Sequence, residues 1–333
     1  MHLDVQLDAP PWETAGRARE LVAAGVGGLF TFEGPHDVFL PLAIASQVVE
    51  TDLMTNVAIA MPRSPMHLAH AAWDLHRLSG GRFRLGLGSQ IKVHIEKRYG
   101  ATWSAPAARM KEIVRAVIAI LESWQHGAPL RFEGEHTRHT LMPPMFNPGP
   151  NPFGRPPVWL GALGPVMTRT AAEVADGLLV MPFHSHRHLA RVTLPAVAEG
   201  LRRSGREQIP IEPQAIVAMA NTPAEREAAD RGVKALLAFY ASTPAYRSVL
   251  EVEGWAELQP ELNRLSKIGE VATMTSLITD EMLATLAVRG TPAECAAEIR
   301  HRFGAFAERV CCYFPGYDPG IDSISELASA LRD

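Results

Sequence analysis

The amino-acid sequence predicts a (β/α)8 barrel, and two observations carry this prediction. Eight short segments rich in Val, Ile, Leu and Phe alternate along the chain with segments whose apolar residues recur at helical spacing. The 333 residues are 47% hydrophobic and 20% charged, which suits one large globular domain over residues 1–333. A doubly wound parallel sheet is the main competing architecture, because it shows the same alternation.

The strand candidates are apolar runs bounded by glycine, proline or polar residues. They cover residues 2–7, 27–33, 54–61, 82–88, 156–162, 176–182, 211–219 and 309–315. Helical spacing predicts helices over residues 12–24, 40–50 and 110–121, and Gly25 ends the first of them.

Further helix starts are marked by a capping residue followed by proline. Ser64 and Pro65 begin a helix whose apolar residues recur at helical spacing as far as Leu78. Thr222 and Thr291 each open the sequence Thr-Pro-Ala-Glu, which is a capping box with proline at the first helical position. These signals are structural, and we assign them no chemical role.

Two stretches interrupt the alternation. Residues 125–157 contain a possible hairpin followed by a proline-rich run, and residues 243–281 read as a helical insertion before the last βα unit. Insertions of this kind are accommodated on barrel loops and often cover the active face, so we expect both to decorate a single barrel domain.

Composition and charge exclude several classes of function. The net charge of −4 provides no basic surface for nucleic acid. No apolar run reaches the roughly 18 residues that span a bilayer, and the first residues do not resemble a signal peptide. Cys295, Cys311 and Cys312 lack metal-ligand spacing and read as reduced thiols. We therefore expect a soluble cytoplasmic protein with no nucleic-acid or membrane partner.

The glycine-rich stretch LSGGRFRLGLGSQ, residues 78–90, raises the question of a dinucleotide-binding turn. Gly86 and Gly88 match the first two glycines of G-x-G-x-x-G, but Ile91 holds the third position. No acidic residue follows at the distance that a ribose contact requires. Gly80 and Gly81 fit a turn before the strand, and Gly88 ends that strand where barrel sites form.

Three blocks of sequence resemble the bacterial luciferase-like superfamily, a family of (β/α)8 barrels. The first is TNVAIAMPRSPMHLAHAAWDLHRLSGGRFRLGLGSQ, residues 55–90. The second is RPPVWLGALGPVMTRTAAEVADGLLV, residues 155–180, and the third is AVRGTPAECAAEIRHRF, residues 287–303. The sequence GLGSQIKVHIEKRYG, residues 86–100, is most similar to the deazaflavin (coenzyme F420) branch.

The resemblance implies an enzyme that transfers a hydride between C5 of coenzyme F420 and a small organic substrate. An FMN-dependent monooxygenase that activates oxygen is the alternative within the fold. A non-catalytic barrel that binds a flavin or another ligand is the alternative from a different class. Members of the family are commonly homodimers, so the resemblance also implies a homodimer.

The resemblance also assigns the cofactor contacts residue by residue. A bulge with a non-prolyl cis peptide, expected at Asn56-Val57, would back the cofactor ring, and Gly88, Ser89 and Gln90 would contact it at the end of the next long strand. The turn Gly161-Ala162-Leu163-Gly164 matches the phosphate-binding turn of the family, where main-chain N–H groups meet an anion at a helix start. An ordinary βα turn would show the same glycines.

Acid/base candidates follow the second predicted strand in the sequence FEGPHD. Glu33, His36 and Asp37 would lie at the barrel mouth, where a histidine beside carboxylates suits proton transfer. In glucose-6-phosphate dehydrogenases of the superfamily an Asp-His pair occupies this place, but here Glu33 and Gly34 align with it. His36 and Asp37 fit a helix-capping loop equally well.

The remaining candidates concern the substrate pocket and a metal. His184 is expected to line the pocket, together with Asp8 and Trp12 after the first strand. His184, His186 and His188 cluster in sequence, but their spacing does not build one metal site, so we predict no metal. His186 and His188 are expected to be solvated residues at a helix start.

Overall fold

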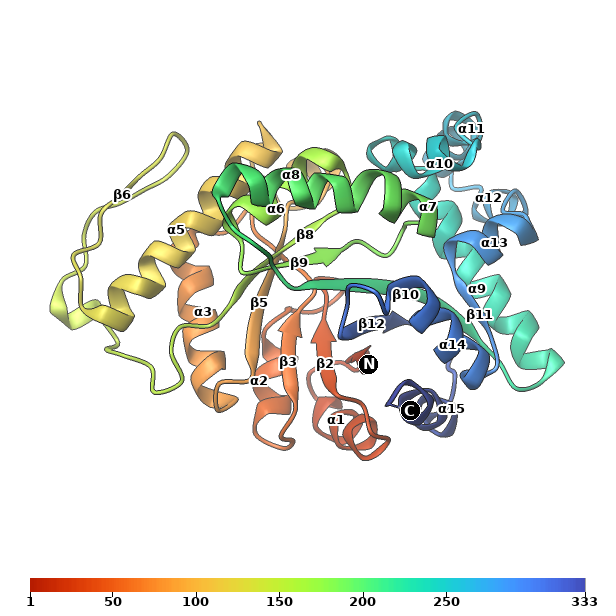
Figure 1. Ribbon diagram of the computed structural model, residues 1–333, viewed down its shortest axis with the longest axis horizontal. Coiled ribbons are helices and arrows are strands. Elements are labelled where there is room, and N and C mark those ends of the chain that lie inside the picture. The colour runs from red at the N-terminus through yellow and green to blue at the C-terminus, as the bar shows by residue number, and fades with distance from the viewer. Residues whose placement is uncertain (333) are drawn as a thin grey trace.

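The computed structural model describes residues 1–332 and shows eight parallel strands closed into a barrel (Figure 1). These strands are β1 (His2–Gln6), β2 (Gly28–Thr31), β3 (Asp52–Thr55), β5 (Phe83–Gly88), β8 (Val158–Ala162), β9 (Gly177–Val180), β10 (Ile211–Met219) and β12 (Arg309–Tyr313). They pair in the order β10-β12-β1-β2-β3-β5-β8-β9, and pairing of β9 with β10 closes the barrel. The predicted fold class and all eight predicted strands are confirmed.

Two short strands extend the barrel and were not predicted as separate elements. β4 (Ala58–Ile59) continues the chain after β3 and pairs with the carboxyl end of β5. β11 (Val288–Gly290) pairs with the carboxyl end of β10. Because β10 is nine residues long, its successive thirds pair with β9, β12 and β11.

Helices surround the barrel on its outer side. The α-helices are α1 (Thr14–Ala23), α2 (Leu40–Ser46), α3 (Pro65–Leu78), α4 (Lys92–Lys97), α5 (Pro106–His126), α6 (Pro165–Val174), α7 (His186–His188), α8 (Leu194–Ser204), α9 (Pro223–Ala241), α10 (Arg247–Glu253), α11 (Leu258–Lys267), α12 (Val271–Ser276), α13 (Asp280–Leu286), α14 (Pro292–Phe303) and α15 (Ile321–Arg332). Short turns of other helix types are η1 (Pro144–Phe146), η2 (Leu189–Thr193, π-helical) and η3 (Pro244–Tyr246). None of the helices in residues 1–332 is long and apolar enough to cross a membrane.

The predicted helix starts are confirmed in detail. The Ser64 side chain accepts a hydrogen bond from the Met66 N–H at the start of α3. Thr222 and Thr291 both form reciprocal capping boxes, with Glu225 and Glu294 respectively. Each cap satisfies main-chain N–H groups that the first helical turn leaves unpaired.

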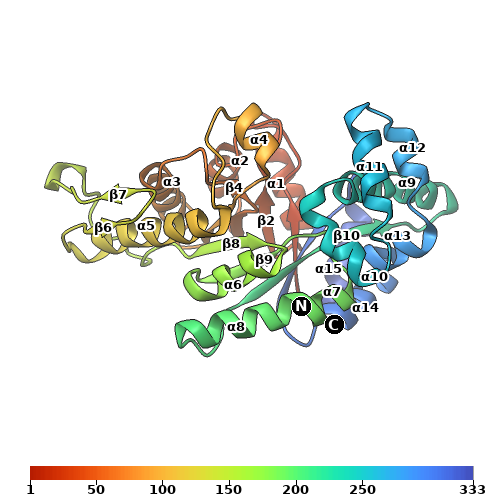
Figure 2. The same ribbon diagram turned by 90° about the horizontal axis from the view of Figure 1, so that it is seen from above.

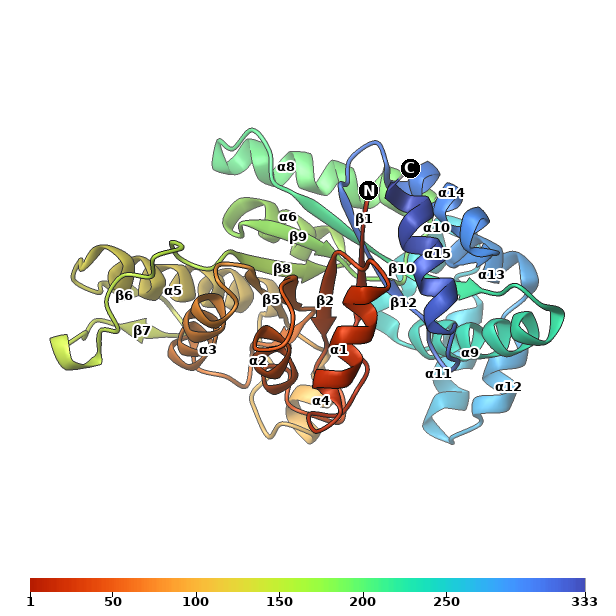
Figure 3. The same ribbon diagram turned by 90° about the horizontal axis from the view of Figure 1, so that it is seen from below.

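The two predicted insertions lie at opposite ends of the molecule (Figure 2). The first carries the antiparallel hairpin of β6 (Phe132–Glu133) and β7 (Arg138–His139). The second contributes η3, α10, α11 and α12, which pack with α9 around a second apolar cluster. Both ends of the chain meet on one side of the barrel, where the Met1 amino group donates to the Leu331 carbonyl oxygen at 2.9 Å (Figure 3).

The amino-terminal half of the barrel interior holds a buried layer of charged residues. Arg84 pairs with Glu212 at 2.6 Å and with Asp4 at 3.3 Å, and Arg309 pairs with Asp4 at 2.5 Å. Cys311 donates its thiol to Glu212 at 3.0 Å, since burial raises the pKa of this thiol well above its ordinary value. Next to this layer the interior holds an apolar cluster from five strands, namely Phe30, Met54, Trp159, Leu179 and Cys311.

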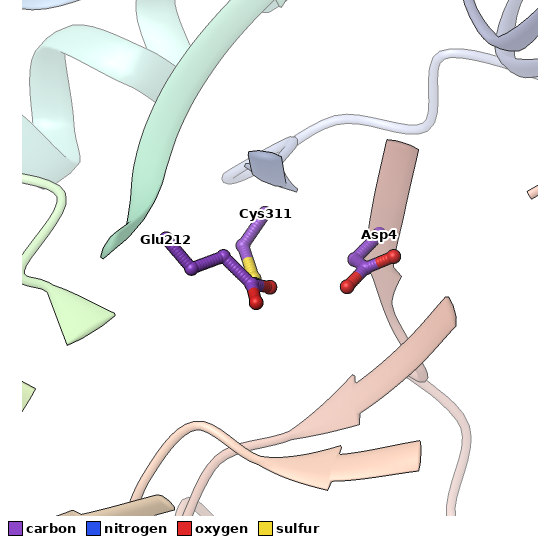
Figure 4. A group of neighbouring side chains, drawn as sticks. All are labelled: Asp4, Glu212 and Cys311. Carbon is purple, nitrogen blue, oxygen red and sulfur yellow. The ribbon is translucent and has the colours of Figure 1, made fainter. Parts of the chain in front are cut away.

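Asp4, Glu212 and Cys311 approach closely enough to resemble a metal-ligand group (Figure 4). Asp4 already pairs with Arg84 and Arg309, and Glu212 pairs with Arg84, so a cation would have to displace a guanidinium from each carboxylate. We therefore assign the group to an ion-pair network within the barrel.

Candidate active site

A bulge follows β3 at the carboxyl end of the barrel. The Asn56-Val57 peptide is cis, as expected, and the chain then resumes as β4 along β5. The Thr55 hydroxyl donates to the Gly86 carbonyl oxygen at 2.8 Å and accepts from the Gly86 N–H at 2.9 Å. The Asn56 N–H donates to the Thr31 carbonyl oxygen at 2.6 Å. The bulge is therefore bonded to strands on both sides.

Glycines on the neighbouring strands make room for this bulge. A Cβ atom on Gly88 would lie 2.3 Å from Val57 Cγ2, and one on Gly86 would lie 2.0 Å from the Thr55 carbonyl oxygen. A Cβ atom on Gly161 would lie 3.0 Å from Val57 Cγ1. These three glycines therefore let β5 and β8 approach the bulge more closely than any other residue would allow.

Asn56 is buried, and the amide nitrogen and oxygen of its side chain have no hydrogen-bond partner among residues 1–332. A buried amide without partners costs free energy that a bound ligand or water can recover. On the far wall, the Tyr313 hydroxyl lies 3.3 Å from the Asn56 carbonyl oxygen and 2.7 Å from Gln214 Oε1. The Tyr313 ring packs against Phe30, with 4.9 Å between ring centroids.

Tyr313 and Gln214 were not predicted as site residues. Each lies two residues beyond a member of the charged layer, Cys311 and Glu212 respectively, so alternation along a strand directs all four side chains inward. Polar residues at alternating positions in an apolar strand are the sequence signal that could have identified them.

Glu33 follows β2 and accepts three hydrogen bonds. Its Oε2 accepts from the Ile59 N–H at 2.8 Å and from Arg63 Nη1 at 2.5 Å, and its Oε1 accepts from the Tyr99 hydroxyl at 2.8 Å. The Glu33 side chain is 7% exposed. Burial and the hydrogen bond to Glu33 raise the pKa of Tyr99 to about 12, so this phenol remains a donor. Arg63 and Tyr99 were not predicted as partners of Glu33.

His36 and Asp37 lie in the same loop between β2 and α2 as Glu33, but both are exposed. Asp37 Oδ1 accepts from the Phe39 N–H at 2.8 Å and from the Leu40 N–H at 2.9 Å, which is the geometry of a capping residue. The His36 ring meets Trp12 edge-on, with 5.4 Å between ring centroids. Proton transfer by His36 or Asp37 stays a prediction.

The structure therefore brings His36 and Trp12 together at the rim. Trp12 is 75% exposed, which is unusual for so large an apolar side chain. Asp8 is exposed and pairs with Arg17 at 3.0 Å. The predicted contribution of Asp8 and Trp12 to a substrate pocket is compatible with this exposure and stays a prediction.

Ser89 and Gln90 lie directly beyond β5. Gln90 has a φ of 59°, in the left-handed region, and its side chain Oε1 accepts from the Ile91 N–H at 3.1 Å. The Ser89 hydroxyl donates to the Gln90 carbonyl oxygen at 3.1 Å. Both residues begin the segment that leads through α4 to the start of α5.

Gly164, the last residue of the predicted phosphate turn, lines a wide-open surface cavity of about 640 Å³ between two helix starts. Gly161 and Ala162 end β8, Leu163 is buried, and Gly164 is the N-cap of α6. The cavity is lined by Ala105, Pro106, Ala107, Ala108, Gly164, Pro165, Val166 and Met167. A Cβ atom on Gly164 would meet no atom within 4 Å.

The lining of this cavity contains no charged side chain, but the first turns of α5 and α6 both contribute to it. The first N–H groups of a helix have no acceptor within the helix, and the helix dipole favours an anion at this end. Pro106 and Pro165 have no N–H, so donors for an anionic group would have to be the N–H groups of Ala107, Ala108, Val166 and Met167. The α5 half of the cavity, residues 105–108, was not predicted from the sequence.

His184 is buried, and its Nε2 bonds to the Gln214 carbonyl oxygen at 3.0 Å. Its ring meets Phe303 of α14 edge-on at 5.7 Å, and burial lowers its pKa to about 3. This neutral ring packs between β10 and α14, and its predicted role in a substrate pocket stays a prediction. The expectation that His188 is solvated was wrong, because its side chain is fully buried.

The closed (β/α)8 barrel matches the fold of the luciferase-like oxidoreductases. The chain belongs to the luciferase-like monooxygenase family, whose match covers residues 5–309. An uncharacterized protein of Mycobacterium tuberculosis is 46% identical over 303 residues, which cover 90% of this chain and 89% of that protein.

A second M. tuberculosis protein, provisionally named a coenzyme F420-dependent oxidoreductase, is 30% identical over 301 residues and 84% of both chains. The solved structure of the coenzyme F420-dependent tetrahydromethanopterin reductase from Methanopyrus kandleri superposes with a TM-score of 0.79 at 19% identity. That superposition covers 100% of this chain and 98% of the other. These relatives confirm the resemblance to the F420 branch.

Proposed function

We propose that the protein is a coenzyme F420-dependent oxidoreductase that transfers a hydride between C5 of the deazaflavin and a small organic substrate. One observation carries the proposal. The cis bulge at Asn56-Val57 adjoins Gly161 of β8, and the turn after β8 leads to the cavity at the starts of α5 and α6. The bulge and the two helix starts thus adjoin opposite ends of the turn from Gly161 to Gly164, an arrangement that suits a ring-bearing phosphodiester cofactor.

The residues present fit such a cofactor. Asn56 offers an unpartnered amide, and Val57, Gly88, Ser89 and Gln90 surround the place assigned to the ring. The turn from Gly161 to Gly164 and the first turn of α5 would hold the phosphate through main-chain N–H groups. When bound, the deazaflavin supplies the hydride chemistry, and the protein supplies orientation and a shielded pocket.

Proton transfer to or from the substrate is assigned to the His36 region. The His36 ring is exposed at the rim, whereas both carboxylate oxygens of Glu33 already accept hydrogen bonds. If His36 moves the proton, His36→Asn should lower turnover by at least about tenfold while cofactor affinity stays unchanged. Unchanged turnover would exclude His36 from this role and leave Glu33 and Asp37 as candidates.

The cofactor is tested by titrating the purified protein separately with coenzyme F420 and with FMN, following cofactor fluorescence. We expect micromolar binding of F420 and much weaker binding of FMN. Micromolar FMN binding with no F420 binding would overturn the proposal in favour of an FMN-dependent monooxygenase. Binding without any substrate turnover would favour a non-catalytic barrel.

Gly164→Asp tests the phosphate cavity, with Gly164→Asn as its matched neutral control. The site has room for a side chain, so both variants should fold, but the aspartate places a negative charge beside the expected phosphate. We expect the aspartate variant to bind F420 at least about tenfold more weakly than the asparagine variant. Equal affinities would remove the phosphate from this cavity.

We also propose that the protein acts on a small molecule as a cytoplasmic homodimer. Three buried free cysteines suit a reducing compartment. Leu141, Met145, Phe146 and Phe153 expose large apolar side chains on the loop after the β6–β7 hairpin, which suits a surface covered by a second subunit. Sedimentation velocity tests the dimer, and a monomer at micromolar concentration would contradict it.

A further inference from the structure

The region around Glu33 connects three parts of the proposed cofactor site that are distant in sequence. The Glu33 cluster consists of Glu33 after β2, Ile59 in β4, Arg63 before α3 and Tyr99 after α4. Ile59 lies two residues beyond the bulge residue Val57. Its N–H donates to Glu33 and so attaches β4, the strand that follows the bulge, to the residue after β2. Tyr99 belongs to the β5–α5 segment, residues 89–105.

The β5–α5 segment runs from the ring side of the proposed site to its phosphate side. It begins at Ser89 and Gln90 and ends at Ala105, which lines the cavity at the start of α5. Gln90, with a φ of 59°, and Ala105, with a φ of 36°, are the non-glycine residues of positive φ within residues 1–332. Both ends of the segment therefore adopt a backbone conformation that their residue types disfavour.

Contacts outside the segment must hold this conformation. Ile95 is buried in the main core and anchors α4. Two hydrogen bonds connect the segment to the loop between β2 and α2. The Tyr99 hydroxyl donates to Glu33 at 2.8 Å, and Arg98 Nη2 donates to the Gly34 carbonyl oxygen at 2.7 Å. Arg98 is exposed to solvent, so the contact with the buried Glu33 carboxylate is the stronger of the two.

We propose that Glu33 is a positioning residue that couples the β5–α5 segment to the bulge strand. Its carboxylate binds the Ile59 N–H and Arg63 through one oxygen and Tyr99 through the other, so it fixes β4 and the segment relative to each other. Tyr99 and Arg63 thereby set cofactor affinity without touching the cofactor. This inference rests on the proposed function for its effect on F420, but the coupling itself exists in the ligand-free protein.

The burial of the Glu33 carboxylate gives the coupling its strength. A buried carboxylate that loses one of its donors retains its charge with fewer hydrogen bonds, which costs more than the loss of a neutral contact. Glu33→Gln keeps the shape of the side chain, because its amide oxygen can accept from the Ile59 N–H while its NH2 group donates to the Tyr99 oxygen. Glu33→Leu keeps the approximate volume and removes every hydrogen bond that the Glu33 side chain accepts.

The first experiment measures trypsin cleavage of the ligand-free protein after Lys92, Lys97 and Arg98, which are exposed residues within the segment. Cleavage requires local opening, and its rate reports the free energy of that opening. We expect Tyr99→Phe and Glu33→Leu to be cleaved in this segment roughly tenfold faster than the wild type, and Glu33→Gln within about twofold of it.

Tyr317→Phe is the matched control for loss of a phenol hydroxyl. The Tyr317 hydroxyl accepts from the Met219 N–H at 2.8 Å and donates to the Val217 carbonyl oxygen at 2.9 Å, away from the Glu33 cluster. Its removal should leave cleavage between residues 89 and 105 at the wild-type rate. A general loss of stability in a variant would instead accelerate cleavage at tryptic sites throughout its chain.

The second experiment measures the F420 dissociation constant of the same variants by fluorescence. The proposal expects Tyr99→Phe and Glu33→Leu to bind several-fold more weakly, and Glu33→Gln to bind as the wild type does. Wild-type cleavage in Tyr99→Phe and Glu33→Leu would overturn the coupling, and faster cleavage with unchanged affinity would overturn its effect on the cofactor. If the wild type binds no F420, the proposed function fails, whereas the cleavage rates still decide whether Glu33 holds the segment.

Discussion

The Tyr313 hydroxyl lies 3.3 Å from the Asn56 carbonyl oxygen, although Tyr313 ends β12 and Asn56 follows β3. β1 and β2 separate these strands in the barrel, so the contact crosses the barrel interior. Gln214 of β10 lies 2.7 Å from the same hydroxyl and fixes its position. The bulge assigned to the cofactor is therefore supported from the opposite wall as well as by its neighbours.

Tyr313→Phe tests this support. The variant keeps the ring that packs on Phe30 and removes only the hydroxyl. We expect F420 to bind roughly tenfold more weakly, because the Asn56 carbonyl loses its contact and the bulge loses its fixed position. Tyr317→Phe removes a hydroxyl with two main-chain hydrogen bonds and should leave the affinity unchanged. Equal affinity of both variants would show that the Tyr313 hydroxyl does not position the bulge.

Gly88→Ala tests the close approach of β5 to the bulge. The added methyl group would lie 2.3 Å from Val57 Cγ2, so Val57 or β5 must move. Overpacking of this kind typically costs about 1–3 kcal/mol, and we expect a loss of that size in the free energy of unfolding measured in urea. Gly16→Ala in α1 is the control, because no atom lies within 4 Å of its added methyl group. It should raise stability by up to about 1 kcal/mol, and equal effects at both positions would contradict the steric account.

Arg84→Met tests the charged layer of the barrel. The Arg84 side chain is 15% exposed and bonds to both Asp4 and Glu212, so its removal leaves buried carboxylates short of a partner. Loss of one member of a buried ion pair typically costs about 3–5 kcal/mol. Arg247→Met, which removes an exposed pair with Glu251, should cost less than about 1 kcal/mol.

The same layer predicts the response to metal removal. Because guanidinium groups already occupy the carboxylates near Cys311, dialysis against EDTA should leave the thermal melting temperature unchanged. A melting temperature that falls with EDTA and recovers with a divalent cation would show that the group of Asp4, Glu212 and Cys311 binds a metal.

The fold could be predicted because alternating strand and helix patterns are local. Each of the eight barrel strands spans four or more residues, and α3, α9 and α14 carry caps that depend on a few neighbouring residues. β4 was predicted only as part of the strand over residues 54–61, and β11 was not predicted, because strands of two and three residues are too short to show a period. The cis bulge at Asn56-Val57 followed from family resemblance rather than from any local pattern.

The contacts within the site could not be predicted in the same way. Arg63 and Tyr99 lie 30 and 66 residues from Glu33, and no spacing rule connects them. Asp37 is the opposite case. It accepts hydrogen bonds from Phe39 and Leu40, which are close in sequence, and a capping role for Asp37 was among the expected alternatives. His188 was expected in solvent as a residue at a helix start, but α10 packs against α7.

His188 gives the protein a pH dependence that follows from its burial. Its side chain is fully buried, neither ring nitrogen has a partner among residues 1–332, and burial lowers its pKa to about 4 despite the charge of Glu253. An unfolded chain binds a proton here near pH 6.5, whereas the folded protein does not until about pH 4. Stability should therefore fall as the pH drops from 6.5 to 4, by up to about 1.4 kcal/mol per pH unit for this group.

His188→Leu should reduce this slope and raise stability at pH 5, because leucine fills a similar volume without polar atoms to bury. The pH dependence left in the variant should come in part from His184, whose pKa is lowered in the same direction to about 3. His126→Leu is the control, since His126 is exposed and pairs only with Glu122 on the surface of α5. Urea unfolding at pH 5, 6 and 7 measures the slopes, and parallel curves for the wild type and His188→Leu would mean that His188 is protonated equally in both states.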